Sequence, residues 1–206
     1  MTPEEIRTAH KHFQKHDPVL AAHIRRYPPY ALKKRRGYFA ILVRSVAGQQ
    51  LSMKAAAAII GRVETFCGGT IRPEHIHAAS HDQLRALGLS NAKASSLKDL
   101  AERVVSGTLK LNGIDRKTDE AIVEILTQVK GIGEWTAQMF LIFCLARPNV
   151  LPVKDLGIKK GIQRVYGLPG LPDESEVSRL AAEKKWSPYC SVASWYLWRS
   201  LEVVEE

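Results

Sequence analysis

Almost every segment of this chain begins and ends like a helix, and few segments alternate apolar and polar residues as strands do. Thr2 with Glu5, and Ser80 with Gln83, have the spacing of capping boxes that start two short helices. Eight longer runs have helical periodicity: 37–50, 52–66, 91–105, 118–129, 134–146, 155–167, 174–186 and 189–204. The sequence therefore predicts an all-α fold of about ten helices.

The chain reads as one domain over residues 1–206, since no stretch rich in Pro, Gly or Ser divides it and no internal repeat is visible. Its 206 residues, 45% of them hydrophobic, can bury one sizeable core or two small lobes. No segment approaches the roughly 20 apolar residues of a membrane span. The opening "MTPEEIRTAHKHF" has no apolar core of a signal peptide. A soluble protein in a reducing, cytosolic setting is expected.

The charge balance favours a polyanionic partner. Thirty Lys and Arg against 21 Asp and Glu give 30 − 21 = +9, and the isoelectric point is near 9.6. Such a balance suits nucleic acid better than a small metabolite, although ordinary solubilising charge remains an alternative. The basic run 33–36, "KKRR", is interpreted as a solvated loop.

Histidines and cysteines do not form a recognisable metal motif. His12 and His16 have the spacing that places two imidazoles on one face of a predicted helix, but no carboxylate cluster accompanies them. Cys67, Cys144 and Cys190 are too few and too widely separated for a zinc or iron–sulfur motif. We interpret them as free thiols, mostly buried.

A glycine hairpin interrupts the helical pattern over about residues 118–146. In "VKGIGEWTAQMF", Gly131 and Gly133 flank Ile132, and an apolar helix follows. Glycines allow positive φ and remove the Cβ atoms that would hold another chain away, while the next helix begins with free amide groups. Such amides bind phosphate, so these residues are candidates for gripping DNA, alone or through a bound monovalent cation. A tight turn in a helical bundle is the alternative.

A second motif, "VLPVKDLGIKKG", places Asp155 where the helix after the hairpin begins. With "GQQLSMKAA", "GLSNAKASSLKDLA", "VKGIGEWTAQMF" and "WSPYCSVASWYLW", the sequence resembles the helix-hairpin-helix DNA glycosylases, and specifically the 3-methyladenine DNA glycosylase II group. The resemblance covers roughly residues 35–200. It implies a two-lobed helical fold with an active-site cleft between the lobes, in a compact form without the N-terminal β lobe of longer relatives.

The resemblance makes Asp155 the catalytic aspartate. Cleavage of an N-glycosidic bond builds positive charge on the sugar, and a fixed carboxylate stabilises that charge and orients the attacking water. Lys154 and the positive end of the helix dipole favour the carboxylate form at this position. An N-capping role for Asp155 is compatible with catalysis.

Two tryptophans complete the predicted base pocket. Bifunctional relatives have a lysine where this chain has Trp135, so no amine nucleophile is expected there. The C-terminal cysteines of the iron–sulfur branch are also missing, and no cofactor is expected. By resemblance, Trp135 and Trp198 stack on the flipped base. Alkylated purines such as 3-methyladenine and 7-methylguanine are cationic, leave readily and suit an aromatic face.

The segment "GQQLS" forms a predicted tip between two helices. Gln49, Gln50, Leu51 and Ser52 provide polar groups for base edges and an apolar wedge, with Leu51 as the wedge. Some relatives have histidine where Ser52 stands. The family commonly has arginine where Cys190 stands, and we interpret Cys190 as a small buried packing residue.

The expected function is monofunctional removal of alkylated purines from double-stranded DNA, the first step of base excision repair. A monomer is expected, with no membrane contact, in the cytoplasm at a bacterial nucleoid or in a eukaryotic nucleus. One alternative is a non-catalytic helix-hairpin-helix DNA-binding protein, which would need the hairpin but not Asp155 or an aromatic pocket. Another is a glycosylase/lyase for other lesions. Hypoxanthine and 1,N6-ethenoadenine also remain open as substrates.

Overall fold

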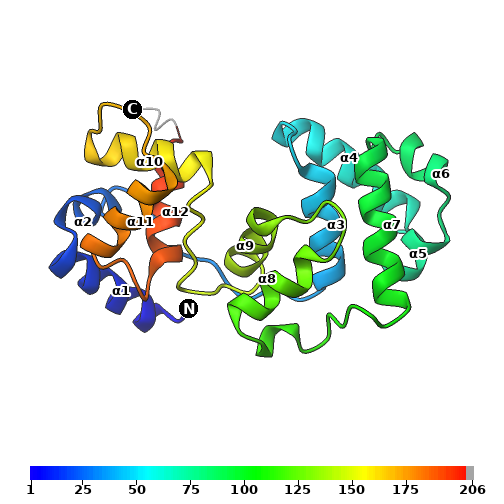
Figure 1. Ribbon diagram of the computed structural model, residues 1–206, viewed down its shortest axis with the longest axis horizontal. Helices are drawn as coiled ribbons and strands as arrows, with labels where there is room; N and C mark the ends of the chain where they lie inside the picture. The colour runs from blue at the N-terminus through cyan, green and yellow to red at the C-terminus, as the bar shows by residue number, and fades with distance from the viewer. Residues whose placement is uncertain (203–206) are drawn as a thin grey trace. The chain divides into compact units, whose positions relative to one another are not determined.

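Helices provide all the regular secondary structure of residues 1–202, the part of the chain that the computed structural model describes (Figure 1). Twelve α-helices and one 3₁₀ turn are present there, and no strand occurs among the described residues. The all-α prediction is confirmed. Two short helices, α2 (Pro18–Ile24) and α5 (Pro73–Ala78), add to the predicted set of about ten.

The chain divides into two compact units. Unit 1 consists of residues 1–34 and the described part of 145–206, and unit 2 consists of residues 35–144. Unit 1 contains α1 (Pro3–His16), α2, α10 (Leu156–Tyr166), α11 (Glu174–Glu183) and α12 (Cys190–Arg199). Unit 2 contains α3 (Tyr38–Gly48), α4 (Met53–Phe66), α5, α6 (His81–Ala86), α7 (Asn91–Val105), the 3₁₀ turn Ile114–Arg116, α8 (Asp119–Thr127) and α9 (Glu134–Phe143).

Helix boundaries follow the local signals of the sequence. Both predicted capping boxes form: the Thr2 hydroxyl accepts from the Glu5 amide, and the Ser80 hydroxyl accepts from the Gln83 amide. The apolar run after Trp135 was predicted to stay helical to Ala146, but α9 ends at Phe143. Ala146 has a φ of 53°, which an α-helix does not accommodate.

The C-terminal helix is also shorter than predicted. The pattern over 189–204 indicated one helix, yet α12 ends at Arg199. Ser200 is its C-cap residue, and the Ser200 hydroxyl donates to the Leu197 carbonyl at 2.6 Å. This hydroxyl supplies a local partner for a carbonyl of the last turn. Residues 203 and 204 of the predicted helix lie outside the described residues.

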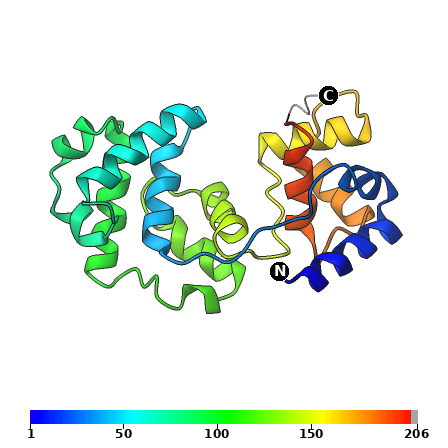
Figure 2. The same ribbon diagram turned by 180° about the vertical axis from the view of Figure 1, so that it is seen from behind.

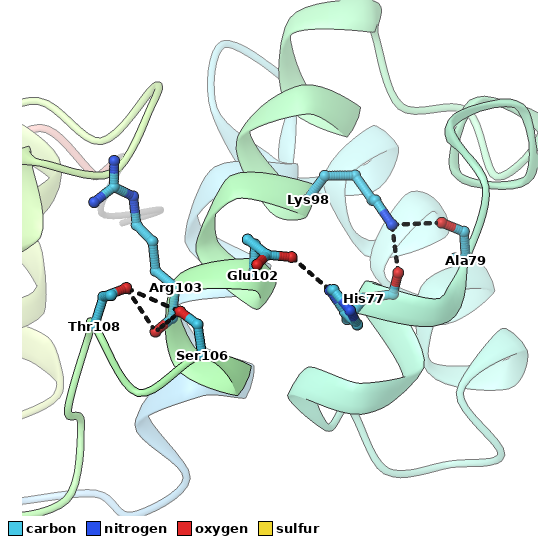
Figure 3. A network of polar contacts seen from close by, with 7 residues as sticks. All are labelled: His77, Ala79, Lys98, Glu102, Arg103, Ser106 and Thr108. Carbon is cyan, nitrogen blue, oxygen red and sulfur yellow. Dashed lines mark hydrogen bonds and ion pairs between the residues drawn. The ribbon is translucent and has the colours of Figure 1, made fainter.

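Helix α7 organises unit 2, where it packs against α3, α5 and α6 (Figures 1 and 2). Ala94, Leu97, Leu100 and Ala101 are fully buried, and their spacing places them on one face of the helix. A polar side chain of α7 adds to its contact with α5. As Figure 3 shows, Lys98 Nζ donates to the carbonyls of His77 and Ala79 at the end of α5.

The same close-up shows how α7 terminates. The hydroxyls of Ser106 and Thr108 both donate to the Arg103 carbonyl, at 3.3 and 3.1 Å (Figure 3). Beside them, His77 Nδ1 lies 3.1 Å from a Glu102 carboxylate oxygen. Side chains therefore satisfy the free carbonyls at the ends of both α5 and α7. This polar framework fixes α7, which in turn holds the segments described next.

Unit 1 has its own core, in which the largest fully buried side chains are Trp186, Tyr196, Tyr30 and Phe13. The ring hydroxyl of Tyr196 accepts from the Tyr30 amide at 3.0 Å, so the polar end of this aromatic residue is satisfied inside the core. Tyr196 is thus a core residue.

Candidate active site

The hairpin predicted around the two glycines joins α8 to α9 in unit 2. Gly131 has a φ of 78°, and Gly133 is the N-cap of α9 with φ −91° and ψ 176°. Gly133 supplies no side-chain cap to this helix. Ile132 is only 3% exposed and anchors the turn in the core.

The two glycines have different structural requirements. A Cβ atom on Gly131 would lie 2.1 Å from Ser96 Oγ, and the positive φ also disfavours a side chain. A Cβ atom on Gly133 would meet nothing within 4 Å, and its extended backbone suits any residue. The prediction of positive φ was therefore correct for Gly131 and wrong for Gly133. The fold itself requires only Gly131, and the space over Gly133 is open.

The predicted tip, residues 49–52, connects α3 to α4 in the same unit. Gln50 adopts a left-handed backbone with φ 56°, which turns the chain, and Leu51 is 39% exposed. Ser52 is the N-cap of α4, and its hydroxyl accepts from the Ala55 amide at 3.3 Å. Ser52 thus caps α4, and its predicted role in DNA binding stays a prediction.

Gln49 ties the tip to the hairpin. Its Nε2 donates to the Gly131 carbonyl at 3.1 Å and to Thr136 Oγ1 at 3.2 Å. The amide of Gln49 therefore contacts the hairpin in this structure, and its predicted contact with base edges stays a prediction. Hydrogen bonds therefore connect the tip to the hairpin, the two segments of unit 2 that are candidates for DNA contact.

Side chains of α7 form hydrogen bonds to both the tip and the hairpin, a role that was not predicted from the sequence. Lys93 Nζ donates to the carbonyls of Ala47 and Gln49 at 3.0 and 2.6 Å. Asp99 Oδ2 accepts from the Lys130 amide, at the start of the hairpin, at 2.8 Å. Burial lowers the pKa of the Lys93 ammonium. The signal was present in the motif "GLSNAKASSLKDLA", which contains both residues, but their partners are distant in sequence.

Asp155 begins α10 in unit 1. It is 9% exposed, and its Oδ1 accepts from the Ile158 amide at 2.8 Å, as an N-cap does. The same oxygen accepts from Trp198 Nε1 at 2.8 Å. Two donors, one from the backbone and one from α12, therefore fix the orientation of this carboxylate.

Gly157 is a further residue of this site that the sequence reasoning missed. A Cβ atom there would lie 2.8 Å from Trp198 Cδ1 and 2.9 Å from Asp155 Oδ1. The absence of a side chain allows the indole to reach the carboxylate across the first turn of α10. The motif "KDLGIKKG" contains this glycine, but the helical pattern does not indicate that Trp198 lies next to it.

The aromatic predictions divide between the two units. Trp198 was predicted to stack on a flipped base, and the structure shows that its indole N–H binds Asp155. Trp135, in the first turn of α9, is 42% exposed. Trp195 has the Arg199 guanidinium 5.2 Å from its ring centroid. Of these side chains, Trp198 has a direct structural link to the candidate catalytic group.

The cysteines and histidines have packing roles. Cys67, Cys144 and Cys190 are buried free thiols, and burial raises the pKa of Cys190 to about 11. His12 Nε2 lies 2.6 Å from the Lys185 carbonyl oxygen, and His10 Nε2 lies 2.9 Å from Tyr196 Oη. Within residues 1–202, no three His, Cys, Asp or Glu side chains are grouped to hold a metal ion. No helix in that range is long and apolar enough to cross a membrane.

These features together define a known class of protein. The regular secondary structure of residues 1–202 is helical, a glycine hairpin joins α8 to α9, the tip is hydrogen-bonded to that hairpin, and Asp155 begins α10. Residues 43–188 match the family described as HhH-GPD superfamily base excision DNA repair protein, and the chain belongs to this family. The DNA-3-methyladenine glycosylase 1 of Schizosaccharomyces pombe is 36% identical over 182 residues, which cover 87% of this chain and 79% of that protein.

Solved structures give the same relationship. A Schizosaccharomyces pombe 3-methyladenine DNA glycosylase in complex with abasic DNA superimposes with a TM-score of 0.86 at 33% identity, over 97% of this chain and 98% of that one. A DNA-3-methyladenine glycosidase from Bacillus halodurans has a TM-score of 0.81 at 36% identity, over 93% of this chain and 88% of that one. The predicted resemblance to 3-methyladenine glycosylases is confirmed.

Proposed function

We propose that this protein is a monofunctional DNA glycosylase that removes alkylated purines, 3-methyladenine and 7-methylguanine among them, from double-stranded DNA. The observation that carries the proposal is Asp155: a nearly buried carboxylate at a helix N-terminus, fixed by the Ile158 amide and the Trp198 indole. A carboxylate held in this way supplies preorganised negative charge where a reaction develops positive charge.

The chemistry assigned to Asp155 is hydrolysis of the N-glycosidic bond. As that bond breaks, its electron pair leaves with the base, and positive charge builds on the sugar ring. The carboxylate stabilises this charge and orients a water molecule, whose oxygen bonds to the anomeric carbon and whose proton passes to the carboxylate or to solvent. An alkylated cationic purine becomes neutral on departure, so it leaves without a general acid.

DNA binding is assigned to unit 2. The open space over Gly133 and the uncapped start of α9 allow a phosphate to approach the backbone amides closely. A monovalent cation bridging the hairpin carbonyls to the phosphate fits the same arrangement. Leu51 is assigned as the wedge that fills the stack after the damaged nucleotide flips out. The exposed indole of Trp135 is assigned to the flipped base, as a face for a cationic purine.

The proposal includes hydrolysis by water rather than by an amine of the protein. Trp135 stands where a Schiff-base lysine would be needed, so no covalent enzyme–DNA intermediate is expected. The product is then an intact strand with an abasic site. The S. pombe glycosylase that resembles this chain over its whole length was solved with abasic DNA, and such DNA is the product that the proposal requires.

The test is to incubate the protein with methylated duplex DNA and to identify the released bases by mass spectrometry, with borohydride added to a parallel sample. Release of 3-methyladenine and 7-methylguanine without a trapped adduct is the expected result. DNA binding without base release would favour a non-catalytic helix-hairpin-helix protein. A robust trapped adduct would favour a glycosylase/lyase, and either outcome overturns the proposal.

A further inference from the structure

The most exposed large hydrophobic side chain among residues 1–202 stands directly beside the tip. Met53, the first residue of α4, is 91% exposed, and Leu51, two positions earlier, is 39% exposed. All residues from Gln50 to Lys54 are exposed. Two apolar side chains thus protrude together from one short segment. Single exposed apolar residues are ordinary, but an adjacent pair at a functional tip suggests a shared contact.

The tip next to Met53 is held in place by several hydrogen bonds. Lys93 binds two of the carbonyls before it, Gln49 binds the hairpin, and the Ser52 hydroxyl caps the helix that Met53 begins. The backbone on both sides of Met53 is therefore fixed by hydrogen bonds. A fixed backbone presents the two apolar side chains at a constant spacing, as a wedge requires.

The surface next to Met53 is suited to a polyanion that approaches closely. The first turn of α4 contains no acidic residue, and Lys54 follows Met53. One turn further, Ala57 and Ala58 are exposed and present only methyl groups. Small side chains and a positive charge next to the exposed Met53 side chain are better suited to contact with a DNA groove than with an apolar protein surface.

We propose that the wedge consists of two side chains, and that Met53 contacts the base left without a partner when Leu51 fills the space of the flipped nucleotide. The inference rests on the proposed function. Flipping empties one strand and leaves an orphan base in the other, so a second apolar group is needed to replace the lost pairing surface. A methionine suits this task because its thioether is polarisable, packs against aromatic rings and adapts to bases of different size.

Binding to an abasic duplex isolates the wedge from the chemistry. The probe is a duplex that contains one tetrahydrofuran abasic analogue opposite each of the four bases in turn, with an undamaged duplex as reference. Met53→Ala is expected to weaken abasic-duplex binding about fivefold, because apolar surface at the orphan base is lost. Binding to the undamaged duplex should stay within about twofold, since phosphate contacts dominate there. Met53→Leu should restore most of the loss.

A matched control is Val105→Ala, because Val105 is 45% exposed at the end of α7 in the same unit and should change neither affinity. Met53 makes no core contact that the fold needs, so Met53→Ala should melt at the wild-type temperature. Equal weakening of abasic and undamaged binding, or unchanged abasic binding, would overturn the inference. Base release by the wild-type protein is measured separately, so failure of the proposed glycosylase activity would be recognised independently.

Discussion

Asp17 and Asp155 are two carboxylates of the same unit with nearly the same local role. Each begins a helix and accepts from a backbone amide three residues later, Leu20 at 3.0 Å for Asp17 and Ile158 at 2.8 Å for Asp155. Each also accepts from an indole N–H at 2.8 Å, that of Trp186 for Asp17 and that of Trp198 for Asp155. Capping and an indole partner therefore do not distinguish a structural carboxylate from the one proposed to act in catalysis.

Access distinguishes them. Asp17 is 0% exposed, and the Tyr166 hydroxyl donates to its Oδ2 at 2.5 Å, beside the Trp186 indole. Burial, with the nearby Asp17 charge, raises the pKa of the Tyr166 hydroxyl, which keeps it a donor. Asp155 retains 9% exposure, and the next residue, Leu156, is 54% exposed. A carboxylate with these hydrogen bonds stabilises the fold when it is fully buried, and it can contact a substrate when it is partly exposed at the surface.

The largest effect is expected for Asp155→Asn. The amide oxygen keeps both acceptor bonds, and asparagine caps helices as well as aspartate, so the melting temperature should change little. The negative charge that stabilises the transition state is lost, and single-turnover excision should fall about 10³-fold or more. DNA affinity should be preserved or improved, because a negative charge near phosphates is removed. Excision at the wild-type rate would remove Asp155 from the mechanism.

Asp17→Asn is expected to have the opposite profile. An amide cannot accept from the Leu20 amide, the Tyr166 hydroxyl and the Trp186 indole at once, so at least one buried donor loses its partner. The free energy of unfolding should fall by about 2–4 kcal/mol. Denaturant unfolding measures this, and excision per folded molecule should be unchanged. A stable but inactive Asp17→Asn protein would contradict the division between the two carboxylates.

Trp198→Phe separates two roles of one indole. Phenylalanine keeps an aromatic face but cannot donate to Asp155, so excision should fall about tenfold if the indole positions the carboxylate. The rate constant at saturating protein should carry the loss, with little change in affinity. Trp186→Phe, the matched change at Asp17, should lower stability and leave excision intact. Wild-type excision by Trp198→Phe would mean that only the aromatic face matters.

The smallest effect is expected at the hairpin. Gly133→Val introduces a branched side chain into open space, so the protein should fold normally but bind damaged and undamaged duplexes about fivefold less tightly. Loss of one phosphate contact should also reduce the slope of log affinity against log salt by roughly 0.9. Gly131→Ala is the contrasting variant, because its side chain would collide with Ser96 and lower stability. Unchanged affinity and salt slope in Gly133→Val would mean that the glycines only turn the chain.

Local signals predicted most of the fold. The capping boxes at Thr2 and Ser80 and the helix α7 over 91–105 formed as the sequence indicated. The short helices α2 and α5 were missed because seven and six residues give too little periodicity to detect, even though Asp17 before Pro18 is a helix start signal. The end of α9 before Ala146 depends on backbone conformation, and the hydrophobic pattern of the sequence did not indicate it.

The candidate site was predictable residue by residue but not contact by contact. Asp155 could be located because it starts a helix within a recognisable motif. Its bond to Trp198 spans 43 residues, and the bond from Lys93 to the Gln49 carbonyl spans 44, so no local pattern encodes either. Gln49 and Ser52 likewise have partners within the protein that the sequence did not indicate, and their predicted contacts with DNA stay predictions.

The most direct test of the account is single-turnover excision from methylated duplex DNA at increasing protein concentration, with wild type, Asp155→Asn and Gly133→Val compared. Asp155 is assigned to the chemical step, and the hairpin is assigned to phosphate binding. Gly133→Val should therefore reach nearly the wild-type rate constant once protein saturates the DNA, whereas Asp155→Asn should stay about 10³-fold slower at every concentration. A wild-type plateau for Asp155→Asn, or a plateau for folded Gly133→Val as low as that expected of Asp155→Asn, would contradict these assignments.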